Sequence, residues 1–213
     1  MIKLIYFDFD FWRIDILRLS LSFAKIPYEY DRIPRKEWPS TKKKFPFGQL
    51  PVMILNGKYF SQTHSLAKFC AKQSSLYDND DMKVLIIDQV LDWANEITNH
   101  IAPSIRAAMR EKDFVKSKRL RKEFIEKDLL TWFSYLEKLF IESSLQSKFF
   151  TDKFSIADIT AWRLLFWFCS GKLDMIPSSF LDKVPVLKKY YSDISNYTPL
   201  NQLKEFKSII NLS

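Results

Sequence analysis

Glycine is scarce in this sequence, with three residues among 213. The turns of all-β sandwiches and the loops that cradle phosphates both depend on glycine, so its scarcity disfavours those two classes. Cysteine and histidine are equally rare, at two residues each, and no Cys-x-x-Cys pair occurs. We therefore expect no metal site, no disulfide framework, and a reduced, cytoplasmic setting.

Long apolar runs are also missing from the chain. No stretch approaches 18 consecutive apolar residues, which excludes a predicted membrane-spanning helix. The first residues lack a basic segment and a small-residue cleavage site, so we expect no secretory signal. Hydrophobic residues make up 47% and charged residues 27%, the balance of a soluble globular protein.

The charge that is present is unevenly distributed. The net charge is +8, and residues 1–76 carry 13 Lys/Arg against 6 Asp/Glu. Much of this excess lies in residues 32–44. A basic loop of this kind is compatible with a solvated surface, a membrane surface, nucleic acid or a small anionic ligand. No nucleic-acid-binding motif accompanies it, so we expect no nucleic-acid partner.

Hydrophobic spacing predicts an α/β first part. The expected order is strand, helix, strand, loop, two strands and helix, at 1–7, 13–25, 28–33, 34–50, 51–55, 58–60 and 66–72. The strand–helix–strand start predicts a parallel pair, and Asn56-Gly57 predicts an antiparallel hairpin. A four-stranded mixed sheet of the thioredoxin-like arrangement follows.

The second part is predicted to be all-helical. Residues 74–81 are polar and acidic, which indicates a linker between domains at 1–76 and 82–213. Long helices are expected at 82–110, where Pro103 should kink or end the helix, and at 114–144. Ser155 and Asp158 have the spacing of a capping box. The very apolar run after them predicts a central, buried helix.

The segment 38–72, WPSTKKKFPFGQLPVMILNGKYFSQTHSLAKFCAK, closely resembles the glutathione-binding segment of sigma-class glutathione transferases. That class includes the glutathione-dependent prostaglandin D synthases. The KLIYF start and the FSIAD sequence also fit. The resemblance implies the glutathione transferase fold, a thioredoxin-like α/β N-terminal domain plus an all-α C-terminal domain. It also implies a homodimer, with the helical domain completing the electrophile site and the dimer interface.

The resemblance implies an enzyme that uses glutathione as co-substrate and conjugates its thiolate to apolar electrophilic small molecules. A free thiol of pKa about 8.5 is only a few per cent ionised at neutral pH, so the thiolate needs stabilisation. Tyr6 matches the family's hydroxyl donor, and Arg13 matches the arginine that further favours the thiolate. From the residues alone, core packing is the favoured interpretation of Tyr6, and Arg13 is equally compatible with an exposed surface.

Further matches concern the glycine and cysteinyl parts of glutathione. Trp38 and Lys42 match positions that bind the glycine end, through an indole N–H and an ammonium group. Phe7 and Gln49 are assigned to the same site by the resemblance. Leu50 would contact the cysteinyl part through its backbone, and Pro51 would follow a cis peptide bond. Spacing alone is also compatible with an ordinary strand start.

The γ-glutamyl end of glutathione has its own matches. Gln62 and Thr63 begin a helix, where free N–H groups and the helix dipole attract the γ-glutamyl carboxylate. Simple helix capping is the alternative. Glu96 aligns with an acidic residue that reaches the γ-glutamyl ammonium across the dimer interface. A solvated helix face is the alternative for Glu96, because Asp88 and Asp92 precede it at four-residue spacing.

The loop after Tyr6 departs from the family pattern. It is one residue longer and has Phe11 and Trp12 where the family often has a small residue. Asp8 and Asp10 would oppose thiolate formation if they faced the sulfur, and we expect them to face solvent. This departure supports an alternative function, a low-turnover protein that binds glutathione and apolar ligands on the same fold. We expect no prostaglandin isomerase activity, because the region of the family's helix tryptophan is occupied by the segment around Pro103.

Overall fold

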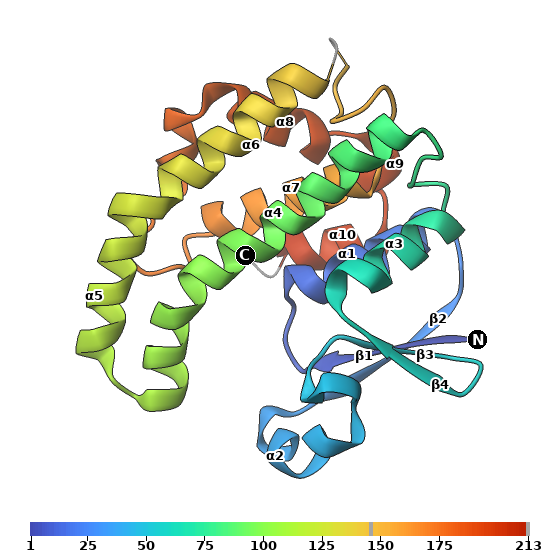
Figure 1. Ribbon diagram of the computed structural model, residues 1–213, viewed down its shortest axis with the longest axis horizontal. Coiled ribbons are helices and arrows are strands. Elements are labelled where there is room, and N and C mark those ends of the chain that lie inside the picture. Colours follow the sequence, from blue (N-terminus) through green and yellow to red (C-terminus); the bar gives the residue numbers. More distant parts are fainter. Residues whose placement is uncertain (145–146, 212–213) are drawn as a thin grey trace. The chain divides into compact units, whose positions relative to one another are not determined.

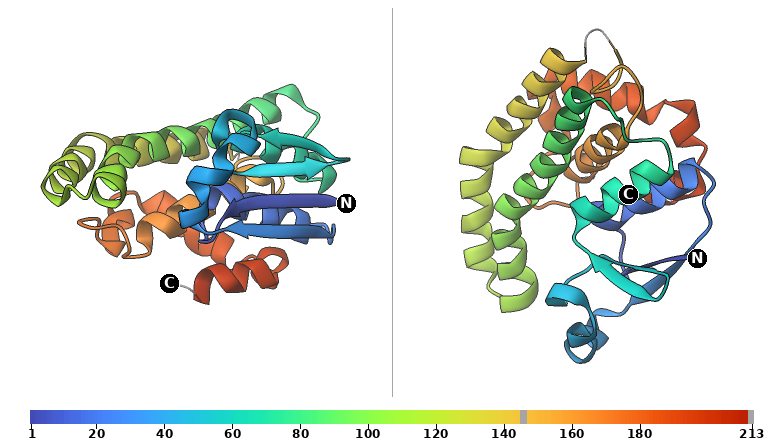
Figure 2. Two further views of the ribbon diagram at one scale, coloured as in Figure 1. Left: turned by 90° about the horizontal axis from the view of Figure 1, so that it is seen from below. Right: turned by 45° about the vertical axis from the view of Figure 1, so that its right-hand side comes forward.

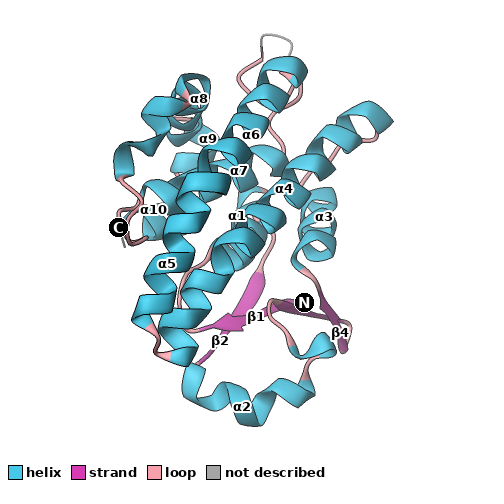
Figure 3. Cartoon of the chain, turned by 60° about the vertical axis from the view of Figure 1, so that its left-hand side comes forward, coloured by secondary structure: helices cyan, strands magenta, loops and turns pink. Residues whose placement is uncertain are grey.

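The computed structural model describes residues 1–144 and 147–211. Contacts group the chain into two compact units, one made of Met1–Asp81 with the chain from Asn196 on, and one made of Met82–Ser195. Among the described residues, strands occur only in the first unit (Figure 3). The fold is a thioredoxin-like α/β domain plus an all-α domain, as predicted. No helix in the described part of the chain is both long and apolar enough to cross a membrane.

The strands and helices are labelled in Figure 1. The first unit contains β1 (Ile2–Phe7), α1 (Trp12–Phe23), β2 (Tyr28–Ile33), α2 (Trp38–Thr41), β3 (Val52–Leu55), β4 (Lys58–Ser61), α3 (Thr63–Gln73), α9 (Thr198–Asn201) and α10 (Lys204–Asn211). The second contains α4, which begins at the boundary (Asp81–Arg106), α5 (Phe114–Phe124), α6 (Leu130–Ser143), α7 (Ile156–Cys169) and α8 (Pro185–Ser195).

The sheet has the mixed topology that the sequence predicted. Its strand order is β2-β1-β3-β4, with β1 and β2 parallel and the other two pairs antiparallel. The hairpin between β3 and β4 turns at Asn56 and Gly57, both with positive φ, which is the conformation that Asn-Gly favours. In the centre of the sheet, Leu4 of β1 pairs with Tyr30 on one side and Met53 on the other.

Two helices of the first unit pack against each other, and the C-terminal helix returns to them. α1 contacts α3, and the apolar side chains of both are buried, among them Leu17 and Leu66. α9 and α10 contact α1, and α10 is drawn in red in Figure 2. Tyr28 donates a hydrogen bond to Glu205 of α10 (3.0 Å), which ties β2 to the end of the chain.

The long helices of the second unit follow the predicted runs with one difference. α4 continues through Pro103 to Arg106 and passes into a π-helical turn at Ala107–Glu111. Of the two predicted outcomes, a kink or an end, the helix does not end at Pro103. Ile101 and Ser104 are both buried, so packing keeps this stretch helical despite the missing N–H.

The predicted capping box is present at the start of α7. Ser155 accepts a hydrogen bond from the N–H of Ala157, and the Asp158 carboxylate accepts one from the N–H of Ser155 (2.8 Å). α7 is buried over most of its length, as its apolar run predicted. The carboxylate of Asp158 also accepts hydrogen bonds from the N–H of Phe150 (3.0 Å) and the hydroxyl of Tyr190 (3.1 Å).

Candidate functional site

Tyr6 lies near the end of β1 and is buried. Its ring makes edge contacts with Phe7 and Phe9, with ring centroids 5.5 and 5.7 Å apart. Burial raises the pKa of the Tyr6 hydroxyl well above its ordinary value, an effect that the nearby Arg13 and Arg35 cations oppose. The phenol therefore stays protonated at neutral pH, which is the state that can donate a hydrogen bond.

Arg13 connects Tyr6 to the start of α3. It lies in the first turn of α1, and its guanidinium stacks on the ring of Trp12 at 4.6 Å. Its Nη1 donates to the hydroxyl of Thr63 (3.5 Å), the first residue of α3. Burial lowers the pKa of Arg13 from its high ordinary value, and the charge interaction with Tyr6 raises it. The structure thus brings together three predicted site residues that are up to 57 positions apart in sequence.

The loop after Tyr6 directs its two carboxylates into ion pairs. Asp8 is 58% exposed and pairs with Arg32 at 2.8 Å. Asp10 is only 17% exposed and pairs with Arg18 at 3.5 Å and Arg32 at 3.7 Å. The expectation of solvent exposure is therefore correct for Asp8 and wrong for Asp10. Cations screen both carboxylates, which weakens their opposition to a nearby thiolate.

Phe7 and Trp38 form part of an aromatic cluster. Their rings meet edge-on at 5.0 Å, and Trp38, the first residue of α2, stacks on Phe45 at 6.0 Å. Phe45 directly follows the basic residues Lys42–Lys44, and no hydrophobic periodicity in this segment marks it as a site residue. Phe9 stacks on Phe7 at 5.6 Å, and Arg35 lies over the Phe9 ring at 4.6 Å. Sequence reasoning missed Phe45, and it missed Arg35 as a cation that acts on Tyr6.

Lys42 lies against the loop that leads to Pro51. It begins a 3₁₀ turn at Lys42–Lys44, and its side chain passes directly beside Gly48. A Cβ placed on Gly48 would lie 2.9 Å from Lys42 Cε, and Gly48 has φ +55°. Only glycine combines this backbone conformation with so close an approach. The sequence gave no reason to single out Gly48.

The Leu50–Pro51 peptide bond is cis, as predicted. Just before it, Gln49 accepts a hydrogen bond through Oε1 from Nε2 of Gln62 (3.3 Å). Gln62 precedes α3 with φ 77°. The Gln49–Gln62 hydrogen bond thus joins the segment before β3 to the start of α3. Thr63, which contacts Arg13, is the next residue after Gln62.

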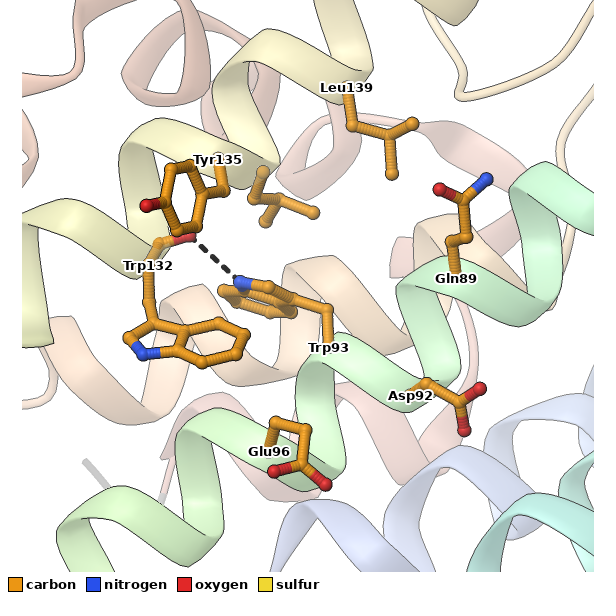
Figure 4. A pocket seen from close by; sticks show the side chains of 8 residues that line it. Gln89, Asp92, Trp93, Glu96, Trp132, Tyr135 and Leu139 are labelled. Carbon is orange, nitrogen blue, oxygen red and sulfur yellow. Dashed lines mark hydrogen bonds between the residues drawn. The ribbon is translucent and has the colours of Figure 1, made fainter.

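Glu96 belongs to the helical unit and lies in a different setting. It is exposed on α4 and lines a groove of about 330 Å³ between α4 and α6 (Figure 4). The other lining residues are Gln89, Asp92, Trp93, Trp132, Tyr135, Leu136 and Leu139. None of them is among the predicted site residues of the first unit. Trp93 and Trp132 are joined by a hydrogen bond from the indole Nε1 of Trp93 to the Trp132 carbonyl (2.8 Å).

The chain's own thiols and metal-binding residues give no alternative site. Burial raises the pKa of both cysteines, Cys70 and Cys169, to about 12. They are therefore poor nucleophiles at neutral pH. In the described part of the chain, no cluster of three or more His, Cys, Asp or Glu side chains is arranged to hold a metal ion.

Comparisons with known proteins identify the family. The family model described as "Glutathione S-transferase, C-terminal domain" matches residues 99–206, which is half of the chain. This chain belongs to the glutathione S-transferase family. A glutathione S-transferase of Anopheles gambiae is 36% identical over 104 residues, 49% of this chain and 50% of that protein. The human hematopoietic prostaglandin D synthase is 30% identical over 94 residues, 44% and 47% of the two chains. The matches span about half the length of these curated relatives.

Solved structures of the family resemble the whole chain. A structure titled prostaglandin synthase D of Nilaparvata lugens has 25% identity and a TM-score of 0.76, covering 99% of this chain and 97% of that one. A glutathione S-transferase of Necator americanus, which its title calls monomeric, has 25% identity and a TM-score of 0.77, covering 99% and 96%. The fold of this family member therefore extends over both units.

Proposed function

We propose that this chain is a sigma-like glutathione transferase that conjugates the glutathione thiolate to apolar electrophilic small molecules. The observation that carries the proposal is the position of Arg13, whose charge acts on Tyr6 and whose guanidinium donates to the Thr63 hydroxyl. A protonated phenol and a guanidinium are both donors that favour a thiolate over a thiol. The proposal includes glutathione as co-substrate, a cytoplasmic location and a role in detoxification.

The glutathione-binding assignments form a chain of contacts in the first unit. Trp38 and Lys42 supply an indole N–H and an ammonium for the glycine carboxylate. The hydroxyl of Thr63 and the N–H groups at the start of α3 suit the γ-glutamyl carboxylate, since an α-helix N-terminus attracts anions. Gln49 and Gln62 are already linked, and Leu50 lies between them and β3. These residues carry the roles that sequence resemblance assigned to them.

Arg35 adds a cation to this proposal. It lies over the Phe9 ring and its charge acts on Tyr6 in the same direction as Arg13. Two positive charges that act on the phenol would favour a bound thiolate beside it. We assign Arg35 a supporting electrostatic role in thiolate stabilisation.

A second candidate function follows from the loop after Tyr6. Phe9 contacts the Tyr6 ring and stacks on Phe7, so an aromatic side chain covers one side of the proposed nucleophile site. A crowded site favours a low-turnover protein that binds glutathione and apolar ligands. The same experiment separates the two candidates.

The deciding experiment is a pH titration of the ultraviolet thiolate absorbance of glutathione bound to the purified protein. For the enzyme, the thiolate signal should persist at least one pH unit below the free thiol's pKa of about 8.5. The Tyr6→Phe protein should bind glutathione within a few-fold and lose that signal, with conjugation at least about tenfold slower. Saturable binding without a thiolate signal favours the ligand-binding candidate.

Tyr30→Phe is the matched control for Tyr6→Phe. Tyr30 lies on β2 next to β1, and burial raises the pKa of its hydroxyl to about 12. Its hydroxyl has no hydrogen-bond partner among the described residues, so removing it changes little else. Equal losses of the thiolate signal in both variants would remove Tyr6 from its proposed role.

A further inference from the structure

The turn between α4 and α5 concentrates positive charge within the helical unit. We define the α4–α5 tip as residues 106–122, which include the π-helical turn Ala107–Glu111 and most of α5. The tip contains eight Lys/Arg and two Asp/Glu. The rest of the chain from residue 77 on contains 12 Lys/Arg against 17 Asp/Glu, so the excess of positive charge in this part of the chain is confined to the tip.

Half of these cations have no acidic partner. Among the described residues, no ion pair involves Arg106, Arg110, Lys112 or Lys118, all of which are exposed. The others are neutralised or buried, as in the pairs Lys116–Glu111, Arg119–Glu123 and Lys122–Glu126. Unpaired exposed cations carry a positive potential that is available to an external anion.

The same tip exposes apolar side chains. Phe114 is 63% exposed, Val115 is 83% exposed and Met109 is 46% exposed. In sequence, all three lie between the unpaired cations, in the segment that joins α4 to α5 and in the first turn of α5. A single exposed apolar residue needs no explanation, but here three occur within seven positions. The unpaired cations lie on both sides of them in sequence, so the tip combines positive charge with exposed apolar side chains.

The tip is held in place by its own contacts. Asp113 caps α5 by accepting from the N–H of Lys116 (2.8 Å). Ser117 donates to the carbonyl of Ser104 (2.8 Å), which joins α5 to α4. Arg121 is buried and donates to the Ser104 hydroxyl (2.9 Å) and the Asp174 carbonyl (3.0 Å). The exposed residues are therefore presented on a preformed hairpin and need little ordering on binding.

We propose that the α4–α5 tip is a docking surface for an anionic lipid bilayer. The unpaired cations suit lipid phosphates and carboxylates, and Phe114, Val115 and Met109 suit the boundary between headgroups and acyl chains. A nucleic acid or an acidic protein would satisfy the cations but would leave the apolar side chains in water. The two characters together favour a membrane surface. The proposal does not depend on the glutathione site.

The test is co-sedimentation of the full chain with vesicles of phosphatidylcholine alone or mixed with phosphatidylserine. Binding should require phosphatidylserine and weaken with added salt. The triple variant Arg106→Gln, Arg110→Gln, Lys118→Gln should bind about 100-fold more weakly, since each cation near an anionic surface contributes about fivefold. The double variant Phe114→Ser, Val115→Ser should bind about tenfold more weakly at unchanged charge.

Matched controls lie elsewhere on the same unit. The charge control is the triple variant Lys127→Gln, Lys148→Gln, Lys183→Gln, which lowers the net charge by as much as the triple tip variant does. The apolar control is the double variant Ile141→Ser, Val186→Ser, which removes exposed apolar side chains outside the tip. Both controls should bind as the original chain does. Absence of binding to the anionic vesicles would overturn the proposal, and so would equal weakening of binding by the control and tip variants. If the chain does not bind vesicles but binds heparin, and the Phe114→Ser, Val115→Ser variant binds heparin equally well, the tip is a site for a polyanion and not for a membrane.

Discussion

Gly48 lies beside Lys42, a residue of the proposed glutathione site. Its φ is +55°, and a Cβ at this position would lie 2.9 Å from Lys42 Cε, so the lysine side chain would have to shift. Gly171 has a similar φ of +71°, and no atom lies within 4 Å of where its Cβ would be. An alanine at either position would therefore have a strained backbone, but only an alanine at Gly48 would also collide with a neighbouring side chain.

We expect Gly48→Ala to weaken glutathione binding and Gly171→Ala to leave it unchanged. Both substitutions should destabilise the chain by about 1 kcal/mol, because alanine is strained at positive φ. Only the first should also displace the Lys42 ammonium. Isothermal titration with glutathione and thermal unfolding of both variants measure the two effects. Equal glutathione affinity in the two variants would show that Lys42 does not bind the ligand.

Thr63 is the second residue whose role can be isolated. Thr63→Val keeps the side-chain shape and removes the hydroxyl that accepts from Arg13. We expect glutathione affinity to fall at least about tenfold, because one hydrogen bond to a charged group contributes about 1.5 kcal/mol or more. Thr63→Ser keeps the hydroxyl and should bind normally. If Val and Ser variants bind equally well, Thr63 serves only to begin α3.

At the scale of elements, the N-terminus of α7 depends on one buried carboxylate. Asp158 accepts hydrogen bonds from two backbone N–H groups and from Tyr190. Burial raises its pKa to about 7, and these hydrogen bonds oppose the rise. The start of α7 is therefore stabilised by the Asp158 carboxyl group, whose charged form is disfavoured by burial.

We expect Asp158→Ala to lower the free energy of unfolding by about 3 kcal/mol, because four buried donors lose their acceptor, namely the N–H groups of Phe150 and Ser155 and the hydroxyls of Ser155 and Tyr190. The exposed Asp152, which pairs with Lys83 at 2.8 Å, provides the control, and Asp152→Ala should leave the unfolding midpoint nearly unchanged. Denaturant unfolding of both variants measures the difference. Similar midpoints for the two variants would contradict a structural role for Asp158.

The raised pKa of Asp158 also has a pH signature. A carboxyl whose pKa is higher in the folded state than its unfolded value of about 4 binds its proton more tightly when folded. Its contribution to stability is therefore fully present below about pH 4 and is lost as the pH rises through about 7. The stability difference between the original chain and Asp158→Ala should shrink over that interval in unfolding measured at several pH values. A constant difference would mean that Asp158 does not titrate there.

At the scale of the whole molecule, sequence resemblance predicts a homodimer. A glutathione S-transferase of Necator americanus with a similar fold is described as monomeric. Sedimentation velocity of the purified chain at low and high micromolar concentration decides between the two states. The proposed role of Glu96 depends on the result, because that role places its carboxylate against glutathione bound by a second copy.

If the chain is dimeric, Glu96→Gln should weaken glutathione binding about tenfold through loss of a charge-assisted hydrogen bond. Asp92→Asn is the matched control, one helical turn earlier on the same groove. It should bind glutathione as the original chain does. A monomeric chain, or equal effects of the two substitutions, would leave Glu96 as an ordinary residue of the α4 surface.

The sequence by itself determined the order of the four strands with α1 and α3, the Asn56-Gly57 hairpin, the capping box at Ser155 and the family. These features depend on local spacing and on residues whose backbone preferences are strong, so neighbouring positions are enough to predict them. The cis bond before Pro51 followed from resemblance of a continuous motif.

Tertiary structure alone decided the charges and contacts around Tyr6. The pairing of Asp10 with Arg18 and Arg32, the position of Arg35 over Phe9 and the contact of Lys42 with Gly48 each join residues from different elements. The continuation of α4 through Pro103 also depends on packing. Local preference sets only a weak bias for such features, and the burial and charge that outweigh it exist only once the chain has folded.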